Sequence, residues 1–132
     1  MIMVRGVLTA CIFALSQTVL AQFVPPRGVD CSNPDAPPPG PSCAFVFLEK
    51  AEQQLNDAYK KLLARLDDEG KTKLRASERA WIGLRDADVA LVVHHYGEGG
   101  SLGSSIAAYR SFQLTQQRAK ELRDRLQDDG HW

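Results

Sequence analysis

The sequence predicts an all-α protein in which three amphipathic helices form an antiparallel, bundle-like arrangement behind a proline-rich arm. Three observations support this fold class. Apolar residues recur every three or four positions in three stretches after residue 42, all seven prolines lie between residues 22 and 42, and nothing alternates as a half-buried strand does. Short connections between amphipathic helices favour antiparallel neighbours.

The first 21 residues have the pattern of a secretion signal. Arg5 precedes an apolar stretch from Gly6 to Leu15, and Val19-Leu20-Ala21 matches the small-residue pattern at which signal peptidase cleaves. A membrane-spanning helix is the alternative, but Ser16-Gln17-Thr18 interrupts the apolar run before it reaches the ~18–20 residues that spanning requires. We therefore expect cleavage after Ala21, a periplasmic or secreted protein, and no stable membrane insertion.

Leu8-Thr9-Ala10-Cys11 also resembles the site at which lipoproteins are cleaved and acylated on cysteine. The apolar run before this site is short. Cleavage there would leave Ile12, Phe13 and Leu15 in an apolar leader on the mature protein. The sequence therefore favours a cleaved signal over a lipid anchor at Cys11.

The charge balance excludes some classes of partner. The chain carries 16 Lys and Arg against 16 Asp and Glu, and loss of Arg5 with the signal leaves a formal charge of about −1. Such a chain has neither the basic field of a nucleic-acid-binding protein nor a strong acidic field. We expect no nucleic-acid partner and no cofactor, while the sequence gives no indication of the oligomeric state.

Residues 22–42 form the predicted extended arm, because its prolines are incompatible with a helix interior or a central strand. Removal of Cys11 leaves two cysteines, Cys31 and Cys43, in a compartment that permits disulfides, so only one intramolecular pairing exists. That bond would tether the arm to the start of the first helix. Residues 43–130 form the predicted helical domain.

The first predicted helix follows Ser42, a suitable N-cap, and ends at Gly70 after Asp67-Asp68-Glu69. The second begins near Thr72 and runs to about Tyr96. Its predicted buried stripe consists of Leu74, Trp81, Leu84, Ala87 and Leu91. Since an interior glycine weakens a helix, Gly83 predicts a close approach by a neighbouring helix.

The segment Gly97–Ser104 is predicted to be a flexible loop, because four of its eight residues are glycine. The third predicted helix follows this loop and ends before Gly130. Its apolar positions recur with helical spacing and are Ile106, Tyr109, Phe112, Thr115, Ala119, Leu122 and Leu126.

No residue pattern predicts catalysis or metal binding. The acidic residues are mixed with Lys and Arg as on solvated helix faces, and neither a Gly-x-Ser-x-Gly elbow nor a Walker pattern is present. His94 and His95 are adjacent, so they diverge by about 100° on a helix and cannot chelate one ion together. We therefore expect no catalytic residues and no metal site, and a protein that acts by binding.

Two polar clusters allow alternative interpretations. Asn56 lies among core-stripe positions near Tyr59, and Arg85 follows Trp81 by four residues, one turn along the same face. Either cluster could belong to a buried polar network that fixes how one helix aligns against its neighbour. The alternative is a recognition patch, since Trp, Tyr and Arg most often anchor interfaces. Proximity to the apolar stripes favours the structural role.

The order and spacing of several motifs resemble the LprI-like N-terminal domain family, formerly a domain of unknown function. The resemblance covers essentially all of the chain after the signal. Its elements are Cys31 and Cys43 with eleven residues between them, Ala51-Glu52-x-x-Leu55-Asn56-x-x-Tyr59, Leu74-x-x-x-Glu78-x-Ala80-Trp81-Ile82-x-x-Arg85-Asp86, Gly99-Gly100-Ser101, and Thr115-x-x-Arg118-x-x-x-Leu122.

This resemblance implies a secreted helical protein of the lysozyme-inhibitor type, because the family is named for a mycobacterial lipoprotein that inhibits lysozyme. A loop around Gly99–Ser104 would then occlude the glycosidase cleft. An envelope adaptor that binds another envelope protein is the alternative. The family's second cysteine pair is missing, with Val89 and a residue near Arg110 in its place. The family pattern further implies structural or recognition roles for Asn56, Tyr59, Trp81, Arg85, Asp86, Thr115 and Arg118.

Overall fold

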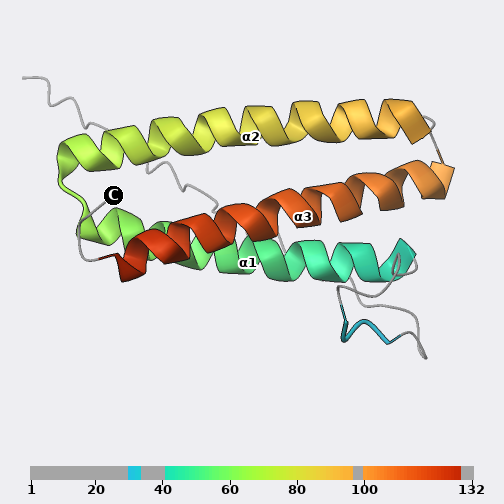
Figure 1. The fold of residues 1–132 in the computed structure, drawn as a ribbon, viewed down its shortest axis with the longest axis horizontal. Helices are drawn as coiled ribbons and strands as arrows, with labels where there is room; N and C mark the ends of the chain where they lie inside the picture. Colours follow the sequence, from blue (N-terminus) through green and yellow to red (C-terminus); the bar gives the residue numbers. More distant parts are fainter. Residues whose placement is uncertain (1–29, 34–40, 97–99, 129–132) are drawn as a thin grey trace, which may run out of the picture.

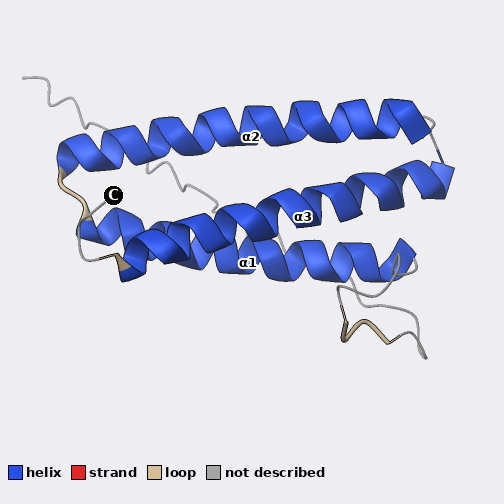
Figure 2. Ribbon diagram, viewed as in Figure 1, coloured by secondary structure: helices blue, strands red, loops and turns tan. Residues whose placement is uncertain are grey.

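The computed structural model describes residues 30–33, 41–96 and 100–128. Helix α1 spans Pro41–Arg65, α2 spans Asp68–Tyr96 and α3 spans Gly100–Gln127. All regular secondary structure in these ranges is helical (Figure 2). The predicted all-α, three-helix fold is therefore confirmed, together with the Cys31–Cys43 disulfide.

The three helices lie side by side, and each runs opposite to the one before it (Figure 1). As a consequence α1 and α3 run in the same direction. α3 packs most extensively on α1 and less on α2, while α1 and α2 make only sparse contact with each other. The core is therefore mainly an α1–α3 interface, on which α2 lies as a third, more weakly attached helix.

Two apolar clusters hold α3 to α1. In one, Leu62 and Leu122 are 2% and 0% exposed and pack with Leu74 of α2. In the other, Phe47 contacts Phe112, with ring centroids 5.5 Å apart, beside the buried Cys43. Burial of each such leucine or phenylalanine side chain contributes about 1.5–3 kcal/mol. Because Cys43 belongs to the second cluster, its disulfide with Cys31 joins residues 30–33 to that end of the core.

The junction between α1 and α2 differs from the prediction. α1 ends at Arg65 and α2 begins at Asp68, so the predicted boundaries at Gly70 and Thr72 are wrong. Asp67 is the N-cap of α2, because its side-chain Oδ1 accepts a hydrogen bond from the backbone N–H of Gly70 at 2.8 Å. Acidic and glycine residues that suggest a helix end thus form the start of the next helix.

The start of α1 also differs from the prediction. The helix begins at Pro41, so Ser42 lies inside it and is not its N-cap. Proline is well suited to the first helical position, where its missing N–H would have no partner in any case. The helical domain therefore extends two residues into the predicted arm.

The inward face of α2 is rotated from the predicted stripe. Leu84 and Leu91 are 70% and 68% exposed, and Ala87 is exposed as well, so their assignment to the core is wrong. Only Leu74 and Trp81 of that stripe face inward. From Leu74 onward the inward positions recur with a period of about 3.5 residues. They are Leu74, Glu78, Trp81, Arg85, Asp88 and Val92, with Val89 and Val93 half-buried beside the last two.

Gly83 lies on the outward side of α2, and a Cβ atom built on it would meet nothing within 4 Å. The predicted close helix approach at this position is therefore wrong. We expect Gly83→Ala to raise the free energy of unfolding by about 0.5–1 kcal/mol, because alanine lowers the backbone entropy of the unfolded chain without a clash. Urea denaturation of the variant would measure this, and a lower midpoint would contradict the open surroundings of Gly83.

The glycine-rich segment is shorter as a loop than predicted. α3 begins at Gly100, which has a φ of 72°, and Ser101–Ser104 form its first turns. The predicted flexible loop through Ser104 is therefore wrong from Gly100 onward, and Gly99 lies outside the described residues. A left-handed φ is the conformation for which glycine is best suited.

The predicted signal, its cleavage site and the lipoprotein-like Cys11 all lie outside the described residues. Within the ranges that the structure describes, no helix is both long enough and apolar enough to cross a membrane.

Candidate functional site

A groove between α1 and α2 brings together four of the residues that the sequence singled out. Its volume is about 370 Å³, within the range of small-ligand pockets. The sparse contact between α1 and α2 explains why this space is not filled by side chains. The residues that line it are Glu52, Leu55, Asn56 and Tyr59 from α1, and Arg75, Glu78, Arg79, Trp81, Ile82 and Arg85 from α2.

Trp81 and Arg85 interact as their four-residue spacing predicts. The guanidinium carbon of Arg85 lies 5.3 Å from the Trp81 ring centroid, a cation–π contact. Nε and Nη2 of the same side chain donate hydrogen bonds to Oδ1 of the exposed Asp86, at 2.9 and 2.8 Å. The arginine is therefore held across the end of the groove, with Nη1 not used in these bonds.

Asn56 and Tyr59 form part of the opposite wall. Asn56 is exposed. Tyr59 is half-buried and packs against the apolar cluster that contains Leu62 and Leu122. The favoured interpretation of Asn56 as a member of a buried network is therefore wrong. Its amide faces the groove, where it is available to a ligand.

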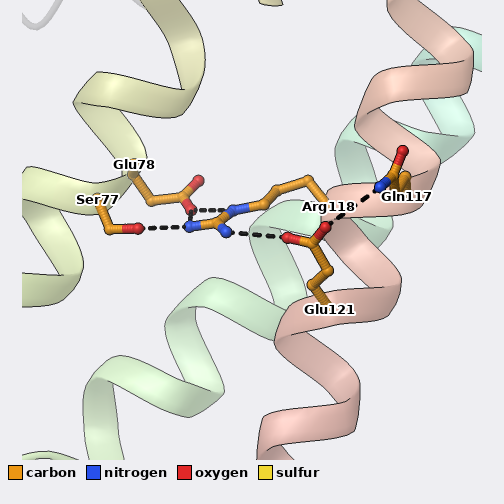
Figure 3. A network of polar contacts seen from close by, with 5 residues as sticks. All are labelled: Ser77, Glu78, Gln117, Arg118 and Glu121. Atoms are coloured by element: carbon orange, nitrogen blue, oxygen red, sulfur yellow. Dashed lines mark hydrogen bonds and ion pairs between the residues drawn. The ribbon is translucent and has the colours of Figure 1, made fainter. Parts of the chain in front are cut away.

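The buried polar network centres instead on Arg118 of α3 (Figure 3). Its side chain is 7% exposed; Nη2 lies 2.7 Å from Oε1 of Glu78 and donates to Oγ of Ser77 at 2.8 Å. Nη1 donates to Glu121 at 3.0 Å. One guanidinium thus joins α2 to α3 and satisfies a carboxylate that is only 13% exposed.

Thr115 lies one turn before Arg118 and is fully buried in α3, as its place in the third stripe predicts. Its hydroxyl has no hydrogen-bond partner among the described residues. Thr115 and Arg118 are therefore core residues and are not part of the groove lining.

Sequence reasoning identified Arg118 only through the family motif, but a signal for its partner was present. Glu78 lies four residues after Leu74 and three before Trp81, on the same helix face as both. A carboxylate on a buried face requires a cation. The opposing helix, α3, carries five basic residues, of which Arg118 is the one that pairs with Glu78.

A second ion pair joins α2 to α3 nearer the hairpin tip, the end of the molecule where α2 finishes at Tyr96 and α3 begins at Gly100. Nε of Arg110 donates to Oδ2 of Asp88 at 2.6 Å, and each side chain is about one-third exposed. The hydrogen bond from Arg110 holds the pKa of Asp88 below its ordinary value of 3.8. It also raises the pKa of Arg110. The pair lies next to Val89, where the family resemblance placed a missing cysteine.

This ion pair predicts a pH-dependent contribution to stability. Because the pKa of Asp88 is lowered on folding, its contribution is present above pH 3.8 and is lost as the pH falls below that value. We expect Asp88→Asn to lower the melting temperature at neutral pH and to have a progressively smaller effect in acid. Thermal denaturation across this range measures the difference, and a constant difference at all pH values would contradict the assignment.

The end of the α2–α3 hairpin presents two large apolar side chains to solvent. Tyr96 at the end of α2 is 63% exposed and Leu102 at the start of α3 is 64% exposed. The Tyr96 ring makes an edge contact with His95, with centroids 4.9 Å apart. Ser101 and Gly100 lie in the first turn of α3 at the same end.

No group of three or more His, Cys, Asp or Glu residues among those described is arranged to hold a metal ion. The polar groups of the groove are arginines, an amide, a phenol and carboxylates. This set is suited to recognising a ligand by hydrogen bonds and charge.

Comparisons with known proteins identify relatives of this chain. The model of the family described as lysozyme inhibitor LprI matches residues 31–122. A DUF1311 family protein from Pseudomonas putida KT2440, known from a crystal structure, is similar with a TM-score of 0.59 and 28% sequence identity, covering 70% of this chain and 95% of that one. The comparison with curated proteins gives no match. Since the family match covers most of the chain, the protein belongs to the lysozyme inhibitor LprI family.

Proposed function

We propose that this protein is an exported, non-catalytic binding protein that inhibits a lysozyme. The observation that carries the proposal is the family match over residues 31–122. Export is supported by the signal-like pattern of residues 1–21, and by the Cys31–Cys43 disulfide, a bond typical of oxidising compartments.

The α2–α3 hairpin tip is the element that we assign to the lysozyme cleft. Tyr96 and Leu102 place two exposed apolar side chains at one end of the molecule. The catalytic carboxylates of a glycosidase lie within a cleft, so an element with exposed apolar side chains that docks there can block substrate access. Gly100 and Ser101 already belong to α3, so these two residues do not have to be ordered on binding, which lowers the entropic cost.

The inhibition test uses the purified, oxidised protein titrated against c-type, g-type and i-type lysozymes, with cell-wall lysis as the readout. We expect stoichiometric inhibition of at least one type. Absence of inhibition of all three at a large molar excess would refute the proposed function.

Export predicts a specific mature N-terminus. Protein recovered from the periplasm or medium should begin at Gln22, because cleavage follows Ala21. Intact mass spectrometry measures this directly. An acylated product that begins at Cys11 would instead support the lipoprotein alternative.

A second candidate function is an envelope adaptor, favoured by Leu84 and Leu91, which lie exposed on the outward face of α2. Crosslinking in the periplasm with a photoreactive residue at Leu84 would test it. Capture of a bacterial envelope protein supports the adaptor role, whereas capture of a lysozyme by a residue at Leu102 supports the inhibitor role.

A further inference from the structure

We propose that the α1–α2 groove binds a carboxylate-bearing sugar. This site lies about 20 Å along α2 from the hairpin tip, given a rise of 1.5 Å per residue between Trp81 and Tyr96. The inference goes beyond lysozyme inhibition and does not depend on it.

Two arginines in the groove have no partner among the residues that the structure describes. Arg75 and Arg79 are exposed, line the same wall one helical turn apart, and make no ion pair or hydrogen bond with any described residue. Like charges at this spacing destabilise a helix. An anion bound between them would remove that repulsion and accept hydrogen bonds from both guanidinium groups.

The other charged groups of the groove offset the two arginines only in part. Glu78 is committed to Arg118 on the buried side of α2, and Arg85 is held by Asp86. Glu52 is the one lining carboxylate without a partner among the described residues, and it belongs to the opposite wall, on α1. Two unpaired arginines thus share the groove with a single unpaired carboxylate, so the groove keeps a net positive charge.

Further along the groove the positive charge continues. Arg75 also lines a second, more open cavity of about 550 Å³, which includes Lys60 and Lys71. Only Asp68 contributes a carboxylate there, and it is paired with Lys71 at 3.4 Å. A ligand that extends past Arg75 would again meet a cationic surface.

The remaining lining residues favour a sugar over a simple acid. Glu52, Asn56 and Tyr59 follow one another at helical spacing along the α1 wall, and offer acceptors and donors that suit hydroxyl and acetamido groups. Trp81 and Tyr59 add ring surfaces, and Leu55 adds an apolar floor. Aromatic surface combined with a few polar groups orients a small ligand, while the arginines select its carboxylate.

The binding test compares matched disaccharides by isothermal titration calorimetry on the purified, oxidised protein. The acidic probes are N-acetylglucosaminyl-N-acetylmuramic acid, which has a lactyl carboxylate, and digalacturonate, which has uronic carboxylates. The neutral probe is diacetylchitobiose. We expect at least one acidic disaccharide to bind about tenfold or more tightly than the neutral one, and whichever acidic probe binds identifies the source of the carboxylate.

Variants assign this binding to the groove. The double substitution Arg75→Gln and Arg79→Gln should weaken binding of the acidic sugar about tenfold and leave the neutral sugar unaffected. Lys73→Gln is the matched control, because Lys73 carries the same charge on α2, is 76% exposed and does not line the groove. Asn56→Ala should weaken both kinds of sugar alike.

Three results would overturn the proposal: equal affinity for acidic and neutral disaccharides, unchanged affinity in the double arginine variant, or binding of tetraglutamate as tight as that of the sugars. Circular dichroism of each variant checks that the helices are intact. Lysozyme inhibition is expected to survive the arginine substitutions, so failure of the sugar site and failure of the inhibitor proposal give different results.

Discussion

Replacement of Arg118 with alanine is expected to lower the free energy of unfolding by about 3 kcal/mol or more. The substitution removes the cation that faces Glu78 and leaves that carboxylate, 13% exposed, without a partner between α2 and α3. It also removes the donor to Ser77. Loss of one member of a buried ion pair is costly because the other charge stays desolvated. Urea denaturation followed by far-ultraviolet circular dichroism measures the change.

The surface pair of Lys120 and Asp124 provides the control for this prediction. Lys120 lies on the same helix two residues after Arg118, but it is 70% exposed, and its 2.6 Å contact with Asp124 is also exposed to solvent. Lys120→Ala should change stability by less than about 0.5 kcal/mol. Equal effects of the two substitutions would contradict a structural role for the Arg118 network.

Reduction of the Cys31–Cys43 disulfide should cost up to about 3 kcal/mol in the chain-entropy description of a short closed loop. The two cysteines are 12 positions apart in sequence, and Cys43 is 2% exposed beside Phe47 and Phe112. The bond therefore restricts the unfolded chain and fixes residues 30–33 next to the core. Melting curves with and without reductant measure the contribution.

A double variant, Cys31→Ser with Cys43→Ser, separates this bond from any other effect of the reductant. Its stability should match that of the reduced protein and should not respond to reductant. The helices should persist, because the disulfide tethers the arm to α1 and does not join one helix to another. Loss of all helical signal on reduction would contradict this local role.

The sequence predicted the buried faces of α1 and α3 well because most of their buried positions are apolar. In α1 the buried positions include Ala51, Leu55, Ala58 and Leu62, at the spacing that periodicity detects. Such a pattern specifies both the existence of a helix and the face that it buries. The number and order of the helices followed from these stripes.

The buried face of α2 was predicted incorrectly because it carries charge. Glu78, Arg85 and Asp88 lie on the inward side, where Arg118, Trp81 and Arg110 respectively satisfy them. Hydropathy places such residues in solvent and assigns Leu84 to the core. The partners of Glu78 and Asp88 lie on α3, 40 and 22 positions away, which periodicity within one helix does not report.

Some helix boundaries were predicted incorrectly for a local reason. Asp67 and Gly70 are compatible both with the end of one helix and with the N-cap and first turn of another. Gly100 likewise suits a loop and also supplies the positive φ at the start of α3. Tertiary packing decides between these alternatives, so single-residue signals were insufficient.

The groove was only partly predictable. Asn56, Tyr59, Trp81 and Arg85 were singled out as a possible recognition patch, and they do line one groove. Arg75 and Arg79 were missed because isolated arginines on a charged helix resemble a solvated face. Their significance depends on the wide separation of α1 from α2, a property of the packing.

The inhibition constant of two matched leucine variants is the most direct test of the central claim, that the protein inhibits lysozyme by placing the α2–α3 tip in the enzyme's cleft. Leu102→Asp changes the tip, and Leu84→Asp changes an equally exposed leucine on the outward face of α2. We expect Leu102→Asp to weaken inhibition about tenfold or more, because it places a charge in an apolar contact, and Leu84→Asp to behave as wild type. Equal inhibition by both variants, or a loss confined to Leu84→Asp, would contradict the assignment of the tip.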